Sequence, residues 1–353
     1  MKNGRLLSIS LPFVAGVACG ALCNVSGGIF PLLVITACMA VLTLSKKYDR
    51  WLILVMLFAL GLFCYSGRCP IAVGNDAFIL RFNDVFDRIP FEDGRTAPLL
   101  RALMTGDRSG LDRETVSAFR RSGASHLLAL SGLHLGIIAM FVRYLLLILG
   151  NSRPAEIVRA VLLVGFCLAY TIACGASPSL VRALLFIVLQ QVAALSPGRR
   201  SSPADRLCLA ATVQLSFDPG AITSVAFQLS YLAMIGIVFI APRLEAWYPS
   251  VAEKEINRRW LSAALKLDPL RRIWKGVSVA IACQLTTAPL VLLRFGNFPQ
   301  YFLLTNLLAM PVCELLLPLA LLTLLLGSPA PLVWMTDKTA TLLLGILGSI
   351  ASL

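Results

Sequence analysis

Both histidines of this 353-residue chain, His126 and His134, lie in one short segment with Ser131 between them. At about 100° per residue in a helix, the two imidazoles would point about 80° apart, and Ser131 would lie about 60° from His134. A serine beside a histidine can begin a nucleophilic site. Acyl transfer also requires a base that reaches the hydroxyl and an oxyanion hole, which one helical turn does not supply. A polar helix face is therefore the stronger interpretation of these side chains.

The opposite face of the same segment carries Gly132 and Gly136. Their spacing is the G-x-x-x-G pattern, which lets the backbone of a second helix approach closely. The segment is thus expected to pack through one face and to be polar on the other.

The chain that positions these residues is very apolar, with 58% hydrophobic and 14% charged residues. Soluble domains have about 45–50% and about 25%, and disordered chains combine low hydrophobicity with high charge. Both classes are excluded. The composition predicts an all-α polytopic integral membrane protein, with about 10–11 transmembrane helices and further amphipathic interfacial helices.

The apolar runs that could cross a bilayer differ in length and in proline content. Leu207–Phe217 is short for a hydrocarbon core of about 30 Å, so it is tilted or re-entrant. Tyr301–Leu326 contains Pro311 and Pro318, which predict a kink or a break. The other runs are Leu6–Leu22, Ile29–Leu44, Trp51–Phe63, His126–Leu149, Ile157–Cys174, Ser179–Leu195, Ile222–Ile240, Val277–Leu293 and Leu332–Leu353.

The net charge of +13 is explained first by the tendency of Lys and Arg to collect in cytoplasmic loops. Lys2 and Arg5 place the N-terminus in the cytoplasm. Counting spans onward, Arg68–Ser125 falls outside the cytoplasm and the densest basic cluster, Arg243–Lys275, falls inside it. This order requires Leu207–Phe217 to cross the bilayer.

Two of the connections are predicted to contain amphipathic helices. In the outer one, apolar residues recur at helical spacing on both sides of Gly94, and Asp112 is a good N-cap for a further helix. In the inner one, tryptophans stand among the cations, as is typical of interfacial segments. We therefore divide the chain into a three-span segment at 1–68, an outer helical segment at 69–125 and a transmembrane module at 126–353.

The ten cysteines contain no C-x-x-C pair and have no neighbouring histidine, so no zinc site is predicted. Most are expected to be buried thiols. Cys64 and Cys69 are the one pair that merits a disulfide test. No cofactor is predicted.

The strongest motif runs from the outer segment into the first span of the module. It reads Gly106-Asp107-Arg108-Ser109-Gly110-Leu111, then Glu114, Phe119-Arg120 and Gly123, and then the block from His126 to His134. Four further blocks follow, at Pro178–Ala183, Asp218–Ala233, Gln284–Pro289 and Asn306–Pro311. Together they closely resemble the ComEC family, the membrane channels of bacterial DNA uptake, over roughly Thr96–Leu326.

The chain also departs from that family. Full-length members carry an extracellular OB-like domain, and many end in a metallo-β-lactamase-like domain that could act as a nuclease. Here the third span is followed almost at once by the outer helices. Two histidines, both inside the motif, cannot supply a metallo-β-lactamase ligand set. The chain resembles the transmembrane core of the family alone.

Eight polar residues within apolar runs are candidates for a DNA path or for a polar cluster that holds helices together. Arg182 could meet phosphate near the outer face, or snorkel to the interface. Glu314 at membrane depth suggests a functional role or a structural pair with an arginine. The full set is His126, Ser131, His134, Arg182, Gln228, Gln284, Asn306 and Glu314.

The inner basic cluster has two interpretations. Anionic lipid attracts such segments by about 1 kcal/mol per cation, which favours an interfacial role. Contact with emerging DNA or with a cytoplasmic motor is the alternative. The cluster includes Arg258, Arg259, Arg271 and Arg272.

The resemblance implies a channel that passes single-stranded DNA through the bacterial inner membrane during transformation. The chain contains no G-x-x-x-x-G-K-[ST] motif, so neither ATPase nor nuclease activity is predicted. The lipid bilayer, a separate DNA receptor, a nuclease, a cytoplasmic ATPase and further copies of the chain are the expected partners. The alternatives are a truncated relic, a small-solute channel, or an intramembrane serine hydrolase that uses Ser131.

The predicted topology can be tested by cysteine labelling. A cysteine at position 258 should react with a membrane-impermeant reagent only after the cells are opened, because Arg243–Lys275 is expected in the cytoplasm. Labelling at this position in intact cells would overturn the order of the spans.

Overall fold

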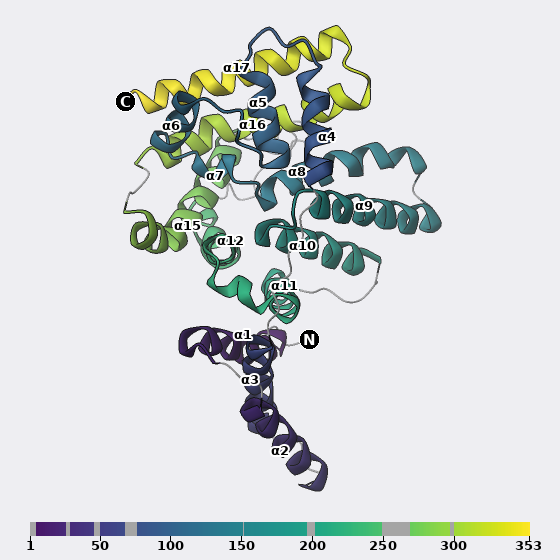
Figure 1. Ribbon diagram of the computed structural model, residues 1–353, viewed down its shortest axis with the longest axis vertical. Coiled ribbons are helices and arrows are strands. Elements are labelled where there is room, and N and C mark those ends of the chain that lie inside the picture. The colour runs from purple at the N-terminus through teal and green to yellow at the C-terminus, as the bar shows by residue number, and fades with distance from the viewer. Residues whose placement is uncertain are drawn as a thin grey trace, which may run out of the picture. The chain divides into compact units, whose positions relative to one another are not determined.

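The computed structural model describes residues 5–25, 29–45, 50–67, 76–150, 152–195, 202–248, 269–296 and 300–353. Every regular element in these ranges is a helix (Figure 1), which confirms the predicted fold class. The chain divides into two compact units. The first contains residues 1–78 and 138–228, and the second contains residues 79–137 and 229–353.

Six stretches of helix are long and apolar enough to cross a membrane. They are α8 with η1 (Gly132–Leu145, Leu146–Leu149), α9 (Arg153–Ala173), α10 (Pro178–Leu195), α12 with η3 and α13 (Val225–Ile235, Gly236–Ile240, Ala241–Glu245), α15 (Pro269–Phe295) and α16 (Phe302–Leu325). The apolar helices α1 (Arg5–Cys23), α2 (Ile29–Ser45) and α3 (Arg50–Ser66) are not among them, because their apolar stretches, Ser10–Cys23, Ile29–Leu42 and Arg50–Ser66, are shorter. Fewer long spans are therefore found in the described residues than the apolar runs predict.

Two further predicted spans, besides the three N-terminal ones, are not among the six. The short run becomes α11 (Pro203–Phe217), which has 15 residues and would extend about 22 Å. It is followed by the 3₁₀ turn η2 (Pro219–Thr223). The last run becomes α17 (Ala330–Ala351), in which Asp337 and Lys338 interrupt the apolar residues. In the second unit α17 packs along α16 (Figure 1) and also contacts α5 (Thr96–Thr105) and α6 (Arg113–Arg121).

The run Tyr301–Leu326, for which the prolines predict a kink or a break, contains no break in the helix. α16 continues through both Pro311 and Pro318 from Phe302 to Leu325. Prolines are tolerated inside membrane helices because local adjustments and neighbouring groups satisfy the freed carbonyls. A different irregularity occurs in α12, which passes into the π-helix η3 at Gly236.

Helices are present at the residues where the sequence predicts the amphipathic helices of the first connection. They are α4 (Asp76–Asp87), α5 and α6, followed by the single turn α7 (Ser125–Leu128). Leu99, Leu100 and Leu103 are fully buried, as their helical spacing predicts. Asp112 is the N-cap residue of α6, although its side chain makes no capping hydrogen bond.

Part of the inner connection lies outside the described residues, including Arg258 and Arg259. Arg271 and Arg272 are exposed at the beginning of α15. There Trp274 Nε1 donates to the Leu244 carbonyl at 3.0 Å, and Lys275 lies 3.7 Å from Glu245. Cys64 is a free thiol, and Cys69 lies outside the described residues, so this pair stays untested.

Close helix crossing depends on glycines other than the predicted pair. In the first unit α1 and α3 pack most extensively. A Cβ on Gly16 would overlap the carbonyl oxygen of Phe58, and a Cβ on Gly61 would overlap that of Phe13. At Gly136 a Cβ would meet no heavy atom within 4 Å, so the close approach expected there is not seen among the described residues.

We expect Gly16→Ala to destabilise the protein by about 1–3 kcal/mol, because the added methyl group forces two backbones apart. Gly165→Ala is the matched control, since a Cβ there meets nothing within 4 Å. That variant should leave the melting temperature unchanged or raise it, because alanine favours a helix over glycine. Thermal unfolding in detergent measures both. Equal melting temperatures for the two variants would contradict the close crossing of α1 and α3.

Candidate functional site

The motif residues of the second unit meet where the outer helices lead into α8. Gly106 ends α5 in the left-handed conformation, at φ 82°, and its N–H donates to Ala102 O at 3.2 Å. A residue with a side chain is strained in this conformation, which explains glycine here. A Cβ at Gly106 would lie 3.4 Å from the side chain of Leu130, so the turn packs against the second half of the motif.

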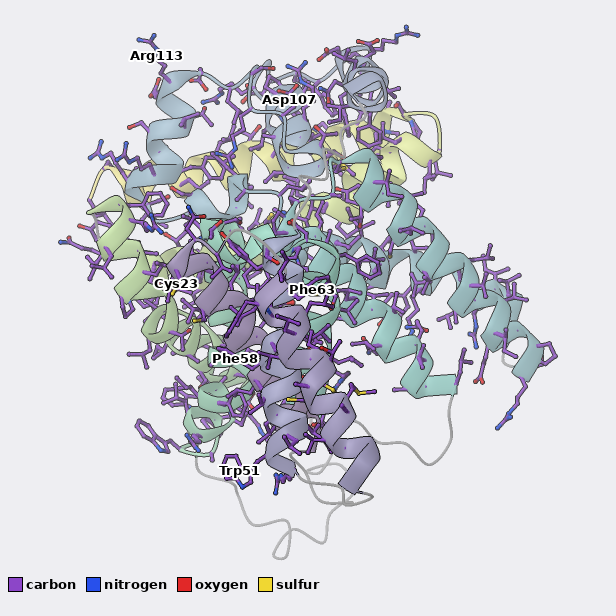
Figure 2. The ribbon with its side chains drawn as sticks, turned by 60° about the horizontal axis from the view of Figure 1, so that its bottom comes forward. Cys23, Trp51, Phe58, Phe63, Asp107 and Arg113 are labelled. Atoms are coloured by element: carbon purple, nitrogen blue, oxygen red, sulfur yellow. The ribbon has the colours of Figure 1, made fainter. Side chains whose placement is uncertain are left out.

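Asp107 holds this turn through its carboxylate (labelled in Figure 2). Its Oδ1 accepts the Ser109 N–H at 3.0 Å, and its Oδ2 accepts Asn83 Nδ2 at 2.7 Å. The hydroxyl of Thr105 lies 3.3 Å from Asn83 Oδ1 and orients that amide. The bonds from Ser109, together with the charge of Arg101 and the Asn83 amide, lower the pKa of Asp107 below its ordinary value.

Arg108 makes the next link. Its Nε donates to the carbonyl oxygen of Leu128 at 3.0 Å, while the residue as a whole remains exposed. Leu128 is the last residue of α7. The adjacent residues Asp107 and Arg108 therefore join α4, the turn and the end of α7.

The segment from His126 to His134 is not one helix, which corrects the angular argument from the sequence. α7 ends at Leu128, Ala129 is extended at φ −78° and ψ 122°, and α8 begins at Gly132. His126 is exposed, and its Nδ1 lies 3.2 Å from Gly123 O. The two imidazoles therefore occupy different elements.

His134 is fully buried at the beginning of α8. Its Nδ1 accepts the backbone N–H of Ser131 at 3.1 Å and lies 3.3 Å from Ser131 Oγ. Because Nδ1 accepts a backbone N–H, the proton of the neutral ring must sit on Nε2. Nε2 has no hydrogen-bond partner among the described residues, so no acid orients the ring as in a hydrolase triad.

The remaining candidates are distributed over both units. In the first unit Arg182 is buried at 8% exposure, in contrast to a snorkelling arginine, and Gln228 Nε2 donates to Ile222 O at 2.9 Å. In the second unit, Gln284 Nε2 and Asn306 Oδ1 are buried atoms without a partner in the described part of the chain. Glu314 is exposed on α16, and its role at membrane depth stays a prediction.

The sequence reasoning missed a buried carboxylate. Asp337 in α17 is 1% exposed and accepts the hydroxyl of Thr96 at 2.6 Å and the N–H of Asp93 at 3.4 Å. The adjacent Lys338 pairs with Glu92 at 2.8 Å. A lone acid in the last apolar run was the available signal, but its partners lie more than 240 positions earlier.

We expect Asp107→Asn to lower stability at pH 7 by about 1.5 kcal/mol, because the charged acceptor is lost. The pKa of Asp107 is depressed in the folded protein, so its contribution is present above the ordinary value of about 3.9 and is lost as the pH falls through the folded pKa. The difference between variant and wild type should therefore shrink at about pH 3. Thermal unfolding at both pH values measures it. Asp84→Asn, an exposed position on α4, is the matched control, and a gap of constant size would contradict the role of the charge.

Comparison with known proteins agrees with the motif. The chain is 28% identical over 213 residues to ComE operon protein 3 of Bacillus subtilis, covering 60% of this chain and 24% of that protein. It is 29% identical over 232 residues to recombination protein 2 of Haemophilus influenzae, covering 63% of this chain and 28% of that protein. It is 31% identical over 176 residues to competence protein ComA of Neisseria gonorrhoeae, covering 48% of this chain and 25% of that protein.

The matched region is thus about a quarter of the length of these curated relatives. No solved structure matches the chain. The profile of the competence protein family matches residues 103–353, which begin just before the Gly106 turn and contain all of the long apolar helices. The chain is therefore a multi-pass membrane protein that belongs to the competence protein family.

Proposed function

We propose that this protein passes single-stranded DNA across the bacterial cytoplasmic membrane during natural transformation. The observation that carries the proposal is the family match over residues 103–353. ComE operon protein 3 and competence protein ComA are similar to the chain over 213 and 176 residues, and this similarity supports a role in DNA uptake.

The site offers physical support for a polar route. A polyanion can cross hydrocarbon only beside polar or cationic groups. Burying such groups in a bilayer costs free energy, so their presence there usually indicates a function. His134 and Ser131 stand at the head of one apolar span, and Arg182 is buried in the first turns of another. A route lined by such groups would not distinguish one base sequence from another.

The proposed direction of passage is inward, with the N-terminus in the cytoplasm and residues 76–125 on the outer face. As further parts of this proposal, a DNA receptor, a nuclease and a cytoplasmic ATPase act together with the protein, and several copies of the chain form one conduit.

The first test is deletion of the gene. Uptake of labelled DNA and transformation frequency should both fall in the deletion strain and return when the gene is restored. Unchanged transformation in the deletion strain would overturn the proposal and leave a relic or a channel for small solutes.

A second test addresses Arg182. Arg182→Gln should lower transformation at unchanged protein abundance, because a buried cation that meets phosphate is lost. Arg182→Lys should restore part of the activity, since a point charge still attracts phosphate but lacks the planar fork. Arg143→Gln is the control, because Arg143 is exposed near the other end of its span. Equal transformation for Arg182→Gln and wild type would remove Arg182 from the route.

A further inference from the structure

The outer segment of the second unit has nearly equal numbers of acidic and basic residues, but the two kinds differ in how many of them form ion pairs or hydrogen bonds. Its acids are largely engaged inside the segment or by α17. Asp87 pairs with Arg101 at 3.0 Å, Asp93 pairs with Arg95 at 2.8 Å, and Glu92 pairs with Lys338. The carboxylate of Asp107 is occupied by Asn83 and Ser109.

The charges at the beginning of α6 are also balanced. Asp112 and Glu114 lie near enough to Arg95 to interact electrostatically. Arg113 stands between these two acids in sequence and projects outward from the helix (Figure 2). This end of α6 therefore carries no concentrated charge.

The other end of α6 is different. Arg120 and Arg121 occupy its last turn, are exposed, and make no ion pair within the described residues. Cations in a last turn favour the helix dipole, but this interaction leaves the guanidinium tips free. The chain then passes directly into α7, which carries the exposed imidazole of His126 and ends at Leu128.

Arg108 reaches the end of α7, the turn that follows α6, from the motif turn. Its Nε is committed to the carbonyl oxygen of Leu128, so the side chain is held in position while its two terminal nitrogens remain available. A guanidinium fixed through Nε presents a planar pair of donors, which is the geometry that suits a phosphate. Phe119, the one Phe, Tyr or Trp among the residues from 106 to 128, is fully buried, so the imidazole of His126 is the one exposed ring in this range.

From these observations we infer that Arg108, Arg120 and Arg121 form a phosphate-binding surface for the backbone of single-stranded DNA, immediately before the helix break that leads into α8. This inference rests on the proposed function and names residues that the strand would contact. Three guanidinium groups with no exposed Phe, Tyr or Trp beside them indicate contact mainly with phosphates, so binding should be independent of sequence and sensitive to salt.

The test uses the full chain in nanodiscs of zwitterionic phosphatidylcholine, with fluorescein-labelled (dT)30 as the probe and anisotropy as the readout. For single strands the logarithm of the association constant falls with the logarithm of salt concentration by about 0.7 per phosphate contact. The triple variant Arg108→Gln, Arg120→Gln, Arg121→Gln should therefore show a slope less negative by about 2, and affinity lower by about 10–100-fold at 0.1 M salt.

The matched control removes the same number of charges elsewhere. Arg143, Arg153 and Arg243 are exposed cations outside this surface, and replacing all three with glutamine gives the same net charge as the test variant. The control should keep the wild-type slope. Because Arg108 also braces Leu128, a double variant of Arg120 and Arg121 tests the surface if the triple variant does not fold. Its slope should change by about 1.4.

Three outcomes would overturn the inference. The first is an unchanged slope in both test variants while the wild type binds (dT)30. The second is the same change in test and control variants, which would show a nonspecific effect of net charge. The third is unchanged DNA binding with loss of co-purified phosphatidylglycerol from the test variant alone, which would make the surface a lipid site. Failure of the proposed function is distinct, since the wild type would then bind no (dT)30 at any salt concentration.

Discussion

Peptide groups without hydrogen bonds are not tolerated in hydrocarbon, and this constraint governs the structure. It explains why every described element is helical. It also makes the interruption between α7 and α8 the most demanding place in the second unit, because the helical ladder stops just before an apolar span. Three bonds compensate there: Arg108 Nε to Leu128 O, Ala129 N–H to Ser125 O, and Ser131 N–H to His134 Nδ1. The first half of the family motif thus supplies, through Arg108, a hydrogen-bond donor to the second half.

The motif turn therefore has a physical role that precedes any role in transport. Asp107 fixes the turn against α4, and Arg108, the next residue, crosses to the end of α7. Because adjacent side chains point in different directions, one short turn can connect three helices. In the same arrangement the local carboxylates are paired or hydrogen-bonded, whereas several guanidinium groups remain exposed. A cationic surface therefore arises in a segment whose numbers of acidic and basic residues are nearly equal.

Close packing of the helices illustrates how context decides the meaning of a pattern. Gly132 and Gly136 have the spacing of a close-packing pair, yet a Cβ at Gly136 would meet nothing nearby. Gly16, Gly61 and Gly236 make the close crossings instead, against carbonyl oxygens of neighbouring helices. A glycine permits an approach, but the second helix must be brought to it by contacts along its whole length, and these are not local in sequence.

The sequence by itself determined the helical membrane class, which residues form the amphipathic helices before α8, and the residues of the motif. These follow from composition, from 3.6-residue periodicity and from N-cap residues such as Asp112, all of which act over a few neighbouring positions. The break before α8, the pairing of Asp107 with Asn83 and the burial of Asp337 beside Thr96 were decided by the tertiary structure. Each depends on a partner supplied by another element, and hydrogen-bonding partners far apart in the chain leave no periodic trace in it. The same reason separates the eight polar candidates: their residue types were evident, but only packing decided that His134 is buried while His126 and Glu314 are exposed.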